Sequence, residues 1–199
     1  MNGLSIIVPV KEPEPFYPHL LEYLEILFDN IPHEILKQEE EGLTNAVVHG
    51  VARAKYNAVG VIDADGSHNP VEFRDMYLAF LENPMKDLVI GSKVLGSDDT
   101  GIFRMLVSAV FRWIASSMLD IHVTDCMSGI VIARKELMDN IVPTSDYKYA
   151  LQILLKTSKV IDFPIHFEKR KSGKSKANAM QSIKILFTIF KLRVHGELK

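Results

Sequence analysis

An apolar run that ends abruptly at two carboxylates constrains this chain more than any other feature. Val59 to Ile62 is predicted to form a buried strand, and Asp63 and Asp65 follow it with one residue between them. In an open α/β sheet, ligands bind at the carboxyl ends of the strands, so this pair is expected at a binding edge. Neighbouring carboxylates repel each other, and a divalent cation with oxygen ligands, Mn²⁺ or Mg²⁺, relieves that repulsion. The alternative is a polar turn that only ends the strand.

The composition is that of an ordinary globular protein. The 199 residues suit one domain, 47% of them are hydrophobic, and the net charge of −2 gives no general affinity for nucleic acid. The single cysteine, Cys126, cannot form an internal disulfide, and no Cys-x-x-Cys pair is present to hold zinc. We find no secretory signal pattern and no apolar stretch long enough to span a membrane. A cytoplasmic protein with at most a peripheral membrane contact is therefore expected.

Strand-like and helix-like patterns alternate along the chain, which predicts an α/β fold with a mostly parallel sheet and helices on both faces. The predicted strands span Leu4–Val10, His33–Lys37, Asn57–Ile62, Asp87–Ile90, Thr124–Ala133 and Val160–Phe167. A first predicted helix has its apolar positions at Leu20–Phe28 and ends near Pro32, and a second follows Gly42 with apolar positions at Ala46–Ala54. The other predicted helices span Val71–Leu81, Gly101–Leu119, Tyr147–Leu155 and Ala177–Arg193. The last helix is basic and amphipathic, so it is expected either to cover the sheet or to lie on a membrane or a partner.

Several short motifs follow one another along the chain: Pro9 at the end of the first strand, Gly42–Ala46, Ile62–Asp65, Val89–Lys93, Asp125–Gly129, and Arg170 ahead of Gly173–Lys176. In this order they resemble the family 2 glycosyltransferases of the GT-A fold, above all the branch with the dolichyl-phosphate mannose synthases and polyprenyl-phosphate glycosyltransferases. The resemblance runs from about Ser5 to about Ile185. It implies one Rossmann-like catalytic domain over 1–199, with a nucleotide-sugar half at about 1–95 and an acceptor half at about 96–199.

The resemblance also implies an activity. It is the inverting transfer of a hexose from a GDP- or UDP-hexose to an acceptor, which is a polyprenyl phosphate, a glycan or a glycoprotein. Asp63 and Asp65, with Ala64 between them, match the family's Asp-x-Asp, which implies binding of Mn²⁺ or Mg²⁺ and of the donor diphosphate. The remaining residues with implied nucleotide-sugar contacts are Pro9, Val10, Glu12, Lys93, Arg104, Ser175 and Lys176. Lys93 replaces the family's Arg and keeps the charge but loses the bidentate geometry that suits phosphate.

Asp125 and Arg170 are the catalytic residues that the resemblance implies. Asp125 matches the family's general base or acceptor-orienting carboxylate. A hydroxyl acceptor needs such a base, whereas a lipid phosphate is already ionised and needs Asp125 only for positioning. Arg170 matches a basic residue directed at the diphosphate or at the acceptor phosphate. His68 follows the acidic pair closely enough to be a third ligand or a phosphate contact, and the alternative is a place outside the ligand sphere.

One part of the family pattern is missing. Residues 31–42 leave room for a single strand, so the strand with the paired base-reading Asp residues and the helix after it are expected to be absent. Such a compact version is similar to small glycosyltransferases of archaeal viruses. The base, the sugar and the acceptor stay open, as does the oligomeric state, for which a homodimer through an apolar helix face is one expectation.

Two other functions stay open at this point. Asp63–Ser67 also resembles the haloacid-dehalogenase phosphatase signature Asp-x-Asp-Gly-Thr/Ser, in which Asp63 would be the nucleophile and Asp65 the acid. That signature belongs on a first strand, whereas two predicted strands precede it here. The other alternative is a non-catalytic nucleotide-sugar-binding protein, which the missing base-reading strand favours.

Overall fold

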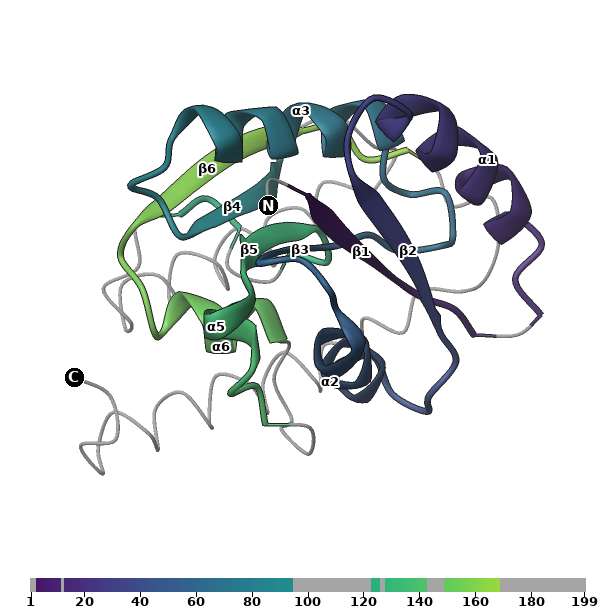
Figure 1. The fold of residues 1–199 in the computed structure, drawn as a ribbon, viewed down its shortest axis with the longest axis horizontal. Helices are drawn as coiled ribbons and strands as arrows, with labels where there is room; N and C mark the ends of the chain where they lie inside the picture. Colours follow the sequence, from purple (N-terminus) through teal and green to yellow (C-terminus); the bar gives the residue numbers. More distant parts are fainter. Residues whose placement is uncertain (1–2, 12, 95–122, 126–127, 143–148, 169–199) are drawn as a thin grey trace, which may run out of the picture.

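The computed structural model describes residues 3–11, 13–94, 123–125, 128–142 and 149–168, and a six-stranded sheet forms its centre (Figure 1). The strands are β1 (Leu4–Pro9), β2 (His33–Gln38), β3 (Ala58–Val61), β4 (Leu88–Lys93), β5 (Val131–Arg134) and β6 (Val160–Ile165). Their order across the sheet is β2-β1-β3-β5-β4-β6. β1 pairs in parallel with β2 and β3, and β4 pairs in parallel with β6. The predicted mostly parallel sheet is confirmed.

Within the described sheet, β5 alone runs antiparallel, against β3 on one side and β4 on the other. The sequence predicted a strand here but not its direction, because an apolar run looks the same in either orientation. The strand is also shorter than the predicted Thr124–Ala133. Thr124 and Asp125 lie ahead of it and form hydrogen bonds with side chains. The segment that opens β5 therefore lies at the edge where β3 and β4 end.

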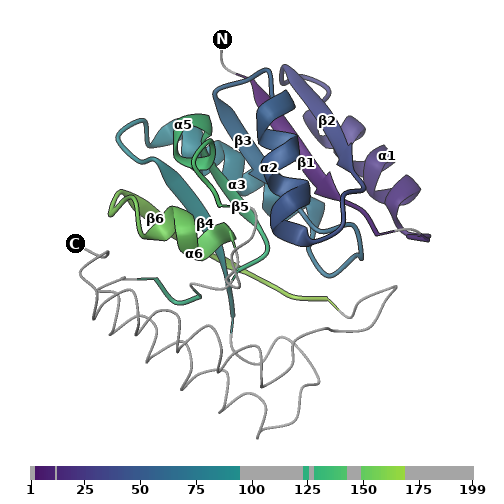
Figure 2. The ribbon, with the colours of Figure 1, turned by 90° about the horizontal axis from the view of Figure 1, so that it is seen from below.

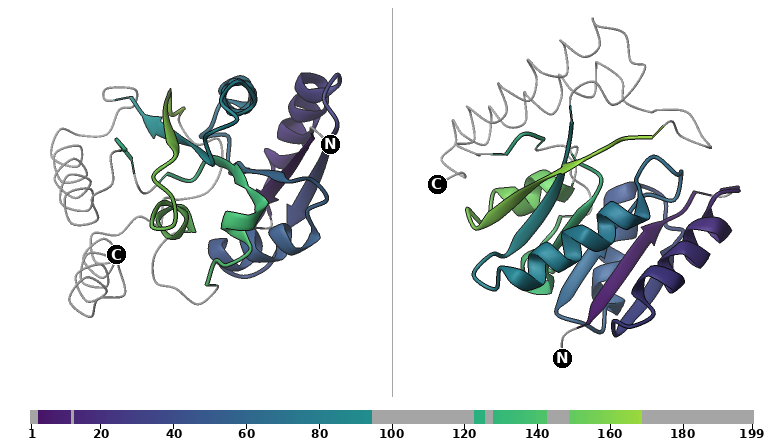
Figure 3. Two further views of the ribbon diagram at one scale, coloured as in Figure 1. Left: turned by 60° about the vertical axis from the view of Figure 1, so that its left-hand side comes forward. Right: turned by 90° about the horizontal axis from the view of Figure 1, so that it is seen from above.

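Helices cover both faces of the sheet, as expected. α1 (Tyr17–Phe28) and α3 (Pro70–Glu82) pack on one face, and α2 (Leu43–Arg53), α5 (Lys135–Met138) and α6 (Tyr149–Leu154) pack on the other (Figure 2 and Figure 3). The helices on each face pack against the sheet and form a separate apolar core with it. Because the inner strands are covered on both sides, they appear in the sequence as continuous apolar runs.

Local signals set the starts of the helices. α3 begins at Pro70, whose missing N–H is not needed in the first turn, and Asn69 caps the helix by accepting a hydrogen bond from the Val71 amide at 2.9 Å. α1 begins at Tyr17, ahead of its first predicted apolar position at Leu20, since Pro18 fits the first turn. The predicted helices at 101–119 and 177–193 lie outside the described residues.

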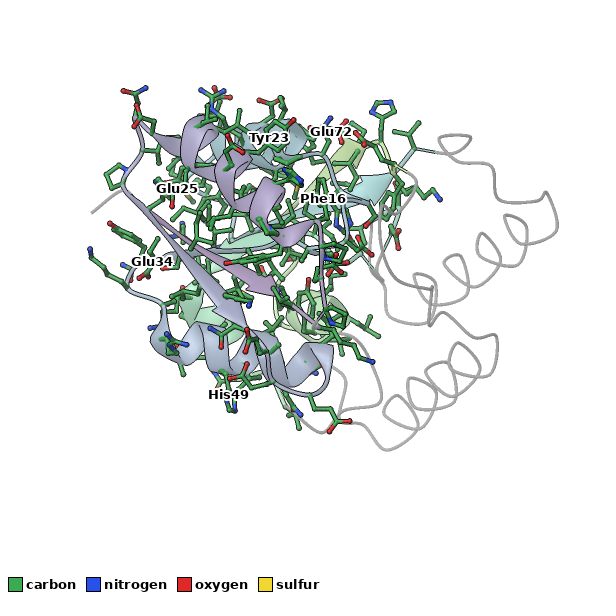
Figure 4. All side chains as sticks on the ribbon, turned by 90° about the vertical axis from the view of Figure 1, so that its right-hand side faces the viewer. Phe16, Tyr23, Glu25, Glu34, His49 and Glu72 are labelled. Atoms are coloured by element: carbon green, nitrogen blue, oxygen red, sulfur yellow. The ribbon has the colours of Figure 1, made fainter. Side chains whose placement is uncertain are left out.

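The amino-terminal half is shortened as the sequence predicts. Residues 29–42, all described, contain β2 and no second strand, so β2 pairs directly with β1 along its whole length. A polar network supports this pairing on the α2 side. The buried Ser5 hydroxyl donates to Glu34 Oε1 at 2.6 Å, and the Lys55 amide donates to the same oxygen at 2.6 Å. Glu34 is labelled on β2 in Figure 4.

Strands β4 and β6 have ends that differ from the prediction. β4 continues to Lys93 rather than ending at Ile90, because its parallel pairing with β6 runs through Lys93 and Ile165. β6 ends at Ile165, and Phe167 forms an isolated bridge instead. None of the described helices combines the length and the apolar character that a membrane span requires.

The contact between α2 and β1 depends on a glycine. A Cβ on Gly50 would lie 2.7 Å from Cγ2 and 2.8 Å from Cδ1 of Ile7. Gly50→Ala should therefore lower the free energy of unfolding by about 1–3 kcal/mol through overpacking. This effect opposes the better helix propensity of Ala, which is worth about 1 kcal/mol. Urea denaturation measures the change, and Ala52→Gly, at an exposed position of α2, reports propensity alone. A rise in stability by the full propensity gain of about 1 kcal/mol would contradict the tight contact.

Candidate active site

Several strand ends meet at one edge of the sheet. The carboxyl ends of β1, β3 and β4 lie there together with the start of antiparallel β5. Asp63 follows β3, Lys93 ends β4, and Asp125 precedes β5. His68 joins the same edge through an antiparallel bridge to Phe167, which follows β6. The topology thus gathers motifs that are far apart in the sequence.

Asp63 lies against the turn that opens β5. Its side chain is 26% exposed, and its Oδ2 lies 3.9 Å from Nδ1 of His68. A Cβ on Gly129 would lie 2.9 Å from the same Oδ2, so a larger residue would displace the carboxylate. Tyr149 on α6 donates its hydroxyl hydrogen to the Gly129 carbonyl at 2.6 Å. α6 therefore holds the glycine turn in contact with Asp63.

Asp65 shapes the turn after β3. Its Oδ1 accepts a hydrogen bond from the Ser67 amide at 3.0 Å, and Gly66 has a φ of 75°, which favours glycine. Ala64, between the two carboxylates, is 3% exposed and belongs to the apolar core on the α1 and α3 side. Asp65 thus stabilises the backbone of this turn.

His68 is buried rather than solvated. It is 3% exposed, and its ring packs edge-on against Phe167 with the centroids 4.9 Å apart. Lys93 Nζ lies 5.2 Å from the centroid of the same Phe167 ring, within cation–π range. The described parts of the chain contain no group of three or more His, Cys, Asp or Glu side chains able to hold a metal ion. A role for His68 as a third ligand or a phosphate contact stays a prediction.

Two environmental effects act on the Tyr149 hydroxyl. Burial raises its pKa well above the ordinary 10.0, and the negative charge of Asp63 raises it further. The hydroxyl thus keeps its proton at any physiological pH and remains a donor to the Gly129 carbonyl.

Asp125 is 9% exposed and lies in a segment that belongs to no strand. Its amide donates to Ser92 Oγ at 3.2 Å. Thr124, immediately before it, donates its amide N–H at 2.8 Å and its hydroxyl hydrogen at 2.6 Å to Oδ2 of Asp162. Side chains of β4 and β6 thereby fix the backbone at Thr124 and Asp125.

Residues 17–142, more than half of the chain, match Glycosyl transferase family 2. The chain belongs to this family. The predicted family is thereby confirmed, and the haloacid-dehalogenase alternative is not supported. The position of Asp63 also disagrees with the phosphatase signature, which belongs on a first strand, because Asp63 follows the third strand along the chain.

Two curated relatives of this glycosyltransferase family member are dolichol-phosphate mannosyltransferases. The one from Pyrococcus furiosus is 28% identical over 211 residues, covering 100% of this chain and 58% of the relative. The one from Mycosarcoma maydis is 27% identical over 169 residues, covering 79% of this chain and 56% of the relative. The chain thus spans a little over half the length of these relatives.

Solved structures with the same fold include a synthase and a mannosyltransferase. Glucosyl-3-phosphoglycerate synthase from Mycobacterium tuberculosis, in complex with Mn²⁺, UDP and phosphoglyceric acid, superposes with a TM-score of 0.70 at 14% identity, covering 96% of this chain and 78% of that one. A mannosyltransferase from Pyrobaculum calidifontis, in complex with GDP-Man and Mn²⁺, gives 0.62 at 12% identity, covering 98% and 64%. These likenesses confirm the predicted GT-A fold.

The predicted site residues divide into two groups. Those that the structure brings to the same edge of the sheet are Pro9, Val10, Asp63, Ala64, Asp65, Lys93 and Asp125. Those that lie outside the described residues are Glu12, Arg104, Arg170, Ser175 and Lys176. The roles given to all of them stay predictions.

Sequence reasoning missed three polar residues near this edge: Gln38, Tyr149 and Asp162. Gln38 ends β2 and is 1% exposed, and neither of its amide atoms has a hydrogen-bond partner in the described part of the chain. A buried unpaired amide is rare and calls for an explanation beyond packing. The only signal in the sequence is a polar residue directly after the predicted strand His33–Lys37.

The unpaired Gln38 amide generates a stability prediction. Gln38→Met keeps the side-chain volume and removes both polar atoms, so it should raise the free energy of unfolding by about 1 kcal/mol. Urea denaturation at neutral pH measures the difference. A loss of stability would mean that the amide makes hydrogen bonds in solution.

The Tyr149 hydroxyl generates a prediction about alkaline pH. Because its pKa is raised in the folded protein, the unfolded chain binds fewer protons above about pH 10, and stability falls as pH rises there. Tyr149→Phe should cost about 1–3 kcal/mol at pH 7, because the Gly129 carbonyl loses its buried donor. The variant should also flatten the decline between pH 9 and 11, measured by urea titrations. Equal slopes in the two proteins would contradict the raised pKa.

Proposed function

We propose that this chain is a metal-dependent glycosyltransferase that moves a hexose from a GDP- or UDP-hexose to a polyprenyl phosphate. The observation that carries the proposal is the pair Asp63 and Asp65 directly after the central strand β3, with Asp63 beside the glycine turn at Gly129. The dolichol-phosphate mannosyltransferases among the relatives support mannose as the sugar and a lipid phosphate as the acceptor.

The donor set at this edge suits Mn²⁺ or Mg²⁺. Mg²⁺ is a hard cation that is usually held by one or two protein carboxylates and keeps its other positions for water and substrate phosphates. Asp63 and Asp65 provide such oxygen ligands, and the missing Cβ at Gly129 leaves room beside Asp63. Mn²⁺ in two structures of the same fold supports this choice. A bound ion would offset the negative charge that develops on the departing nucleotide diphosphate.

The chain's own residues bind and orient the two substrates in this proposal. Lys93 contributes positive charge at the end of β4, and Arg104, Arg170 and Lys176 contact the donor diphosphate or the acceptor phosphate. Ser175 adds a donor contact, while Pro9, Val10 and Glu12 contact the nucleobase. The half at about 1–95 binds the nucleotide sugar, and the half at about 96–199 binds the acceptor and adds the contacts to the donor just named.

The acceptor determines the role of Asp125. A lipid phosphate is ionised at neutral pH, so one of its oxygens attacks the anomeric carbon without prior loss of a proton. The bond from that carbon to the diphosphate breaks with its electron pair leaving on the diphosphate, and the configuration inverts. Asp125 then orients the acceptor and does not act as a base. A glycan hydroxyl acceptor would need Asp125 as the base.

Peripheral membrane contact fits a polyprenyl phosphate acceptor. The apolar helix faces that the sequence predicts at 102–119 and 180–193 would bind the membrane surface. Alternatively, one of these faces would form the contact between two copies in a homodimer. Flotation with anionic liposomes distinguishes these alternatives, since only membrane binding carries the protein upward with the liposomes.

A second candidate is a non-catalytic nucleotide-sugar-binding protein, which the shortened amino-terminal half favours. Both candidates bind a nucleotide sugar, and only the enzyme releases free nucleotide diphosphate and glycosylated lipid.

Asp63→Asn provides the test of the proposed function. Changes to the outer partners of metal ligands already cost about 10–100-fold in affinity, so the loss of a ligand charge should weaken Mn²⁺-dependent binding of GDP-mannose or UDP-glucose by at least about tenfold. Calorimetry with Mn²⁺ and with EDTA measures binding, and labelled transfer to dolichyl phosphate measures turnover. Asp75→Asn, an exposed position on α3, is the control. Binding without transfer supports the second candidate, and metal-independent transfer by Asp63→Asn would reject the assignment.

A further inference from the structure

One carboxylate on β6 connects three separate parts of the chain. Asp162 Oδ1 accepts the Ser92 hydroxyl hydrogen, and its Oδ2 accepts both the amide N–H and the hydroxyl hydrogen of Thr124, at 2.8 Å and 2.6 Å. Ser92 Oγ in turn accepts the amide N–H of Asp125 at 3.2 Å. Consecutive backbone amides, those of Thr124 and Asp125, are thus held by Asp162, one directly and one through Ser92.

This arrangement needs a carboxylate. Every group that faces the Asp162 oxygens in these contacts is a donor, and an ionised carboxylate accepts on both oxygens. Asparagine has nearly the same shape but presents one accepting oxygen and one donating NH₂ group. Asn at 162 would therefore set a donor against either Ser92 or Thr124.

The sheet does not depend on these contacts. β4 and β6 already pair in parallel from Leu88 and Val160 to Lys93 and Ile165 through their backbones. The segment at 123–125 belongs to no strand, so side-chain contacts rather than a ladder fix its backbone. With Asp125 only 9% exposed, a change in its backbone position would alter where its carboxylate lies.

We propose that Asp162 is a positioning residue that sets the direction of the Asp125 carboxylate toward the acceptor. The role given to Asp125 rests on the proposed function. The positioning itself rests on the hydrogen bonds alone. Asp162 acts through Ser92 and Thr124 and does not touch the substrates.

Asp162→Asn tests this role, with Asp75→Asn as the matched control. Displacement of a reacting group by about 1 Å can cost about 100-fold in rate, so kcat for transfer from GDP-mannose to dolichyl phosphate should fall by about 10–100-fold. The Kd for GDP-mannose with Mn²⁺ should stay within about twofold, because Asp63 and Asp65 lie on another segment. A kcat within about twofold of the wild type, or an equal loss of donor affinity, would overturn the proposal.

A double-mutant cycle checks the path of the effect. Ser92→Ala should lower kcat in the wild-type background and add little in Asp162→Asn, because both changes release the same amide. If the losses in kcat from the two substitutions add in the double variant, the proposed route from Asp162 through Ser92 to Asp125 is wrong. If Asp162→Asn does not fold, Thr124→Val takes its place, since it removes one hydroxyl bond and keeps the side-chain shape.

Hydrogen exchange separates this inference from the proposed function. Asp162→Asn should speed exchange of the Thr124 and Asp125 amides by at least about tenfold, while the amides of β1 and β3 keep their wild-type rates. Unchanged exchange at 124 and 125 would overturn the positioning role whatever the activity. Faster exchange in a protein that transfers no sugar would support the positioning of the segment and reject the proposed activity.

Discussion

The site depends on the direction of β5. A strand inserted antiparallel between β3 and β4 presents its amino end where its neighbours present their carboxyl ends. The segment with Asp125 and Gly129 therefore meets Asp63 at one edge, although more than sixty residues separate them in sequence. A parallel β5 would carry this segment to the opposite edge, and Gly129 could not contact Asp63. The pairing direction of one four-residue strand thus determines which motifs share a site.

Much of the fold follows from patterns that the sequence carries openly. Buried strands such as β1 appear as apolar runs, and Asn69 with Pro70 marks the start of α3. The direction of β5 could not be predicted, since strand pairing is a long-range property that the strand's own residues do not record. For the same reason the sequence did not indicate Asp162 and Tyr149. Their hydrogen-bond partners Thr124 and Gly129 lie about 40 and 20 residues away in the chain. The motifs led to Asp63, Asp65 and Asp125, but not to the residues that hold them.

Polar groups at this edge are supported by the apolar layers behind them. Tyr149 and His68 are buried next to Asp63, where low polarity strengthens the effect of each charge on its neighbours. Hydrogen bonds, rather than solvent, fix the orientation of the turn at Gly129. A site built in this way is organised before any ligand arrives.

The shortened amino-terminal half has a consequence for self-association. β2 ends the described sheet on one side, next to β1 alone. A strand at a sheet edge offers backbone groups to which another chain can add a strand, and charged side chains discourage that pairing. β2 carries Glu34 and Lys37, and Lys37 forms an ion pair with Glu39 just beyond the strand. Charged side chains at this edge of the described sheet disfavour the addition of a strand from another copy.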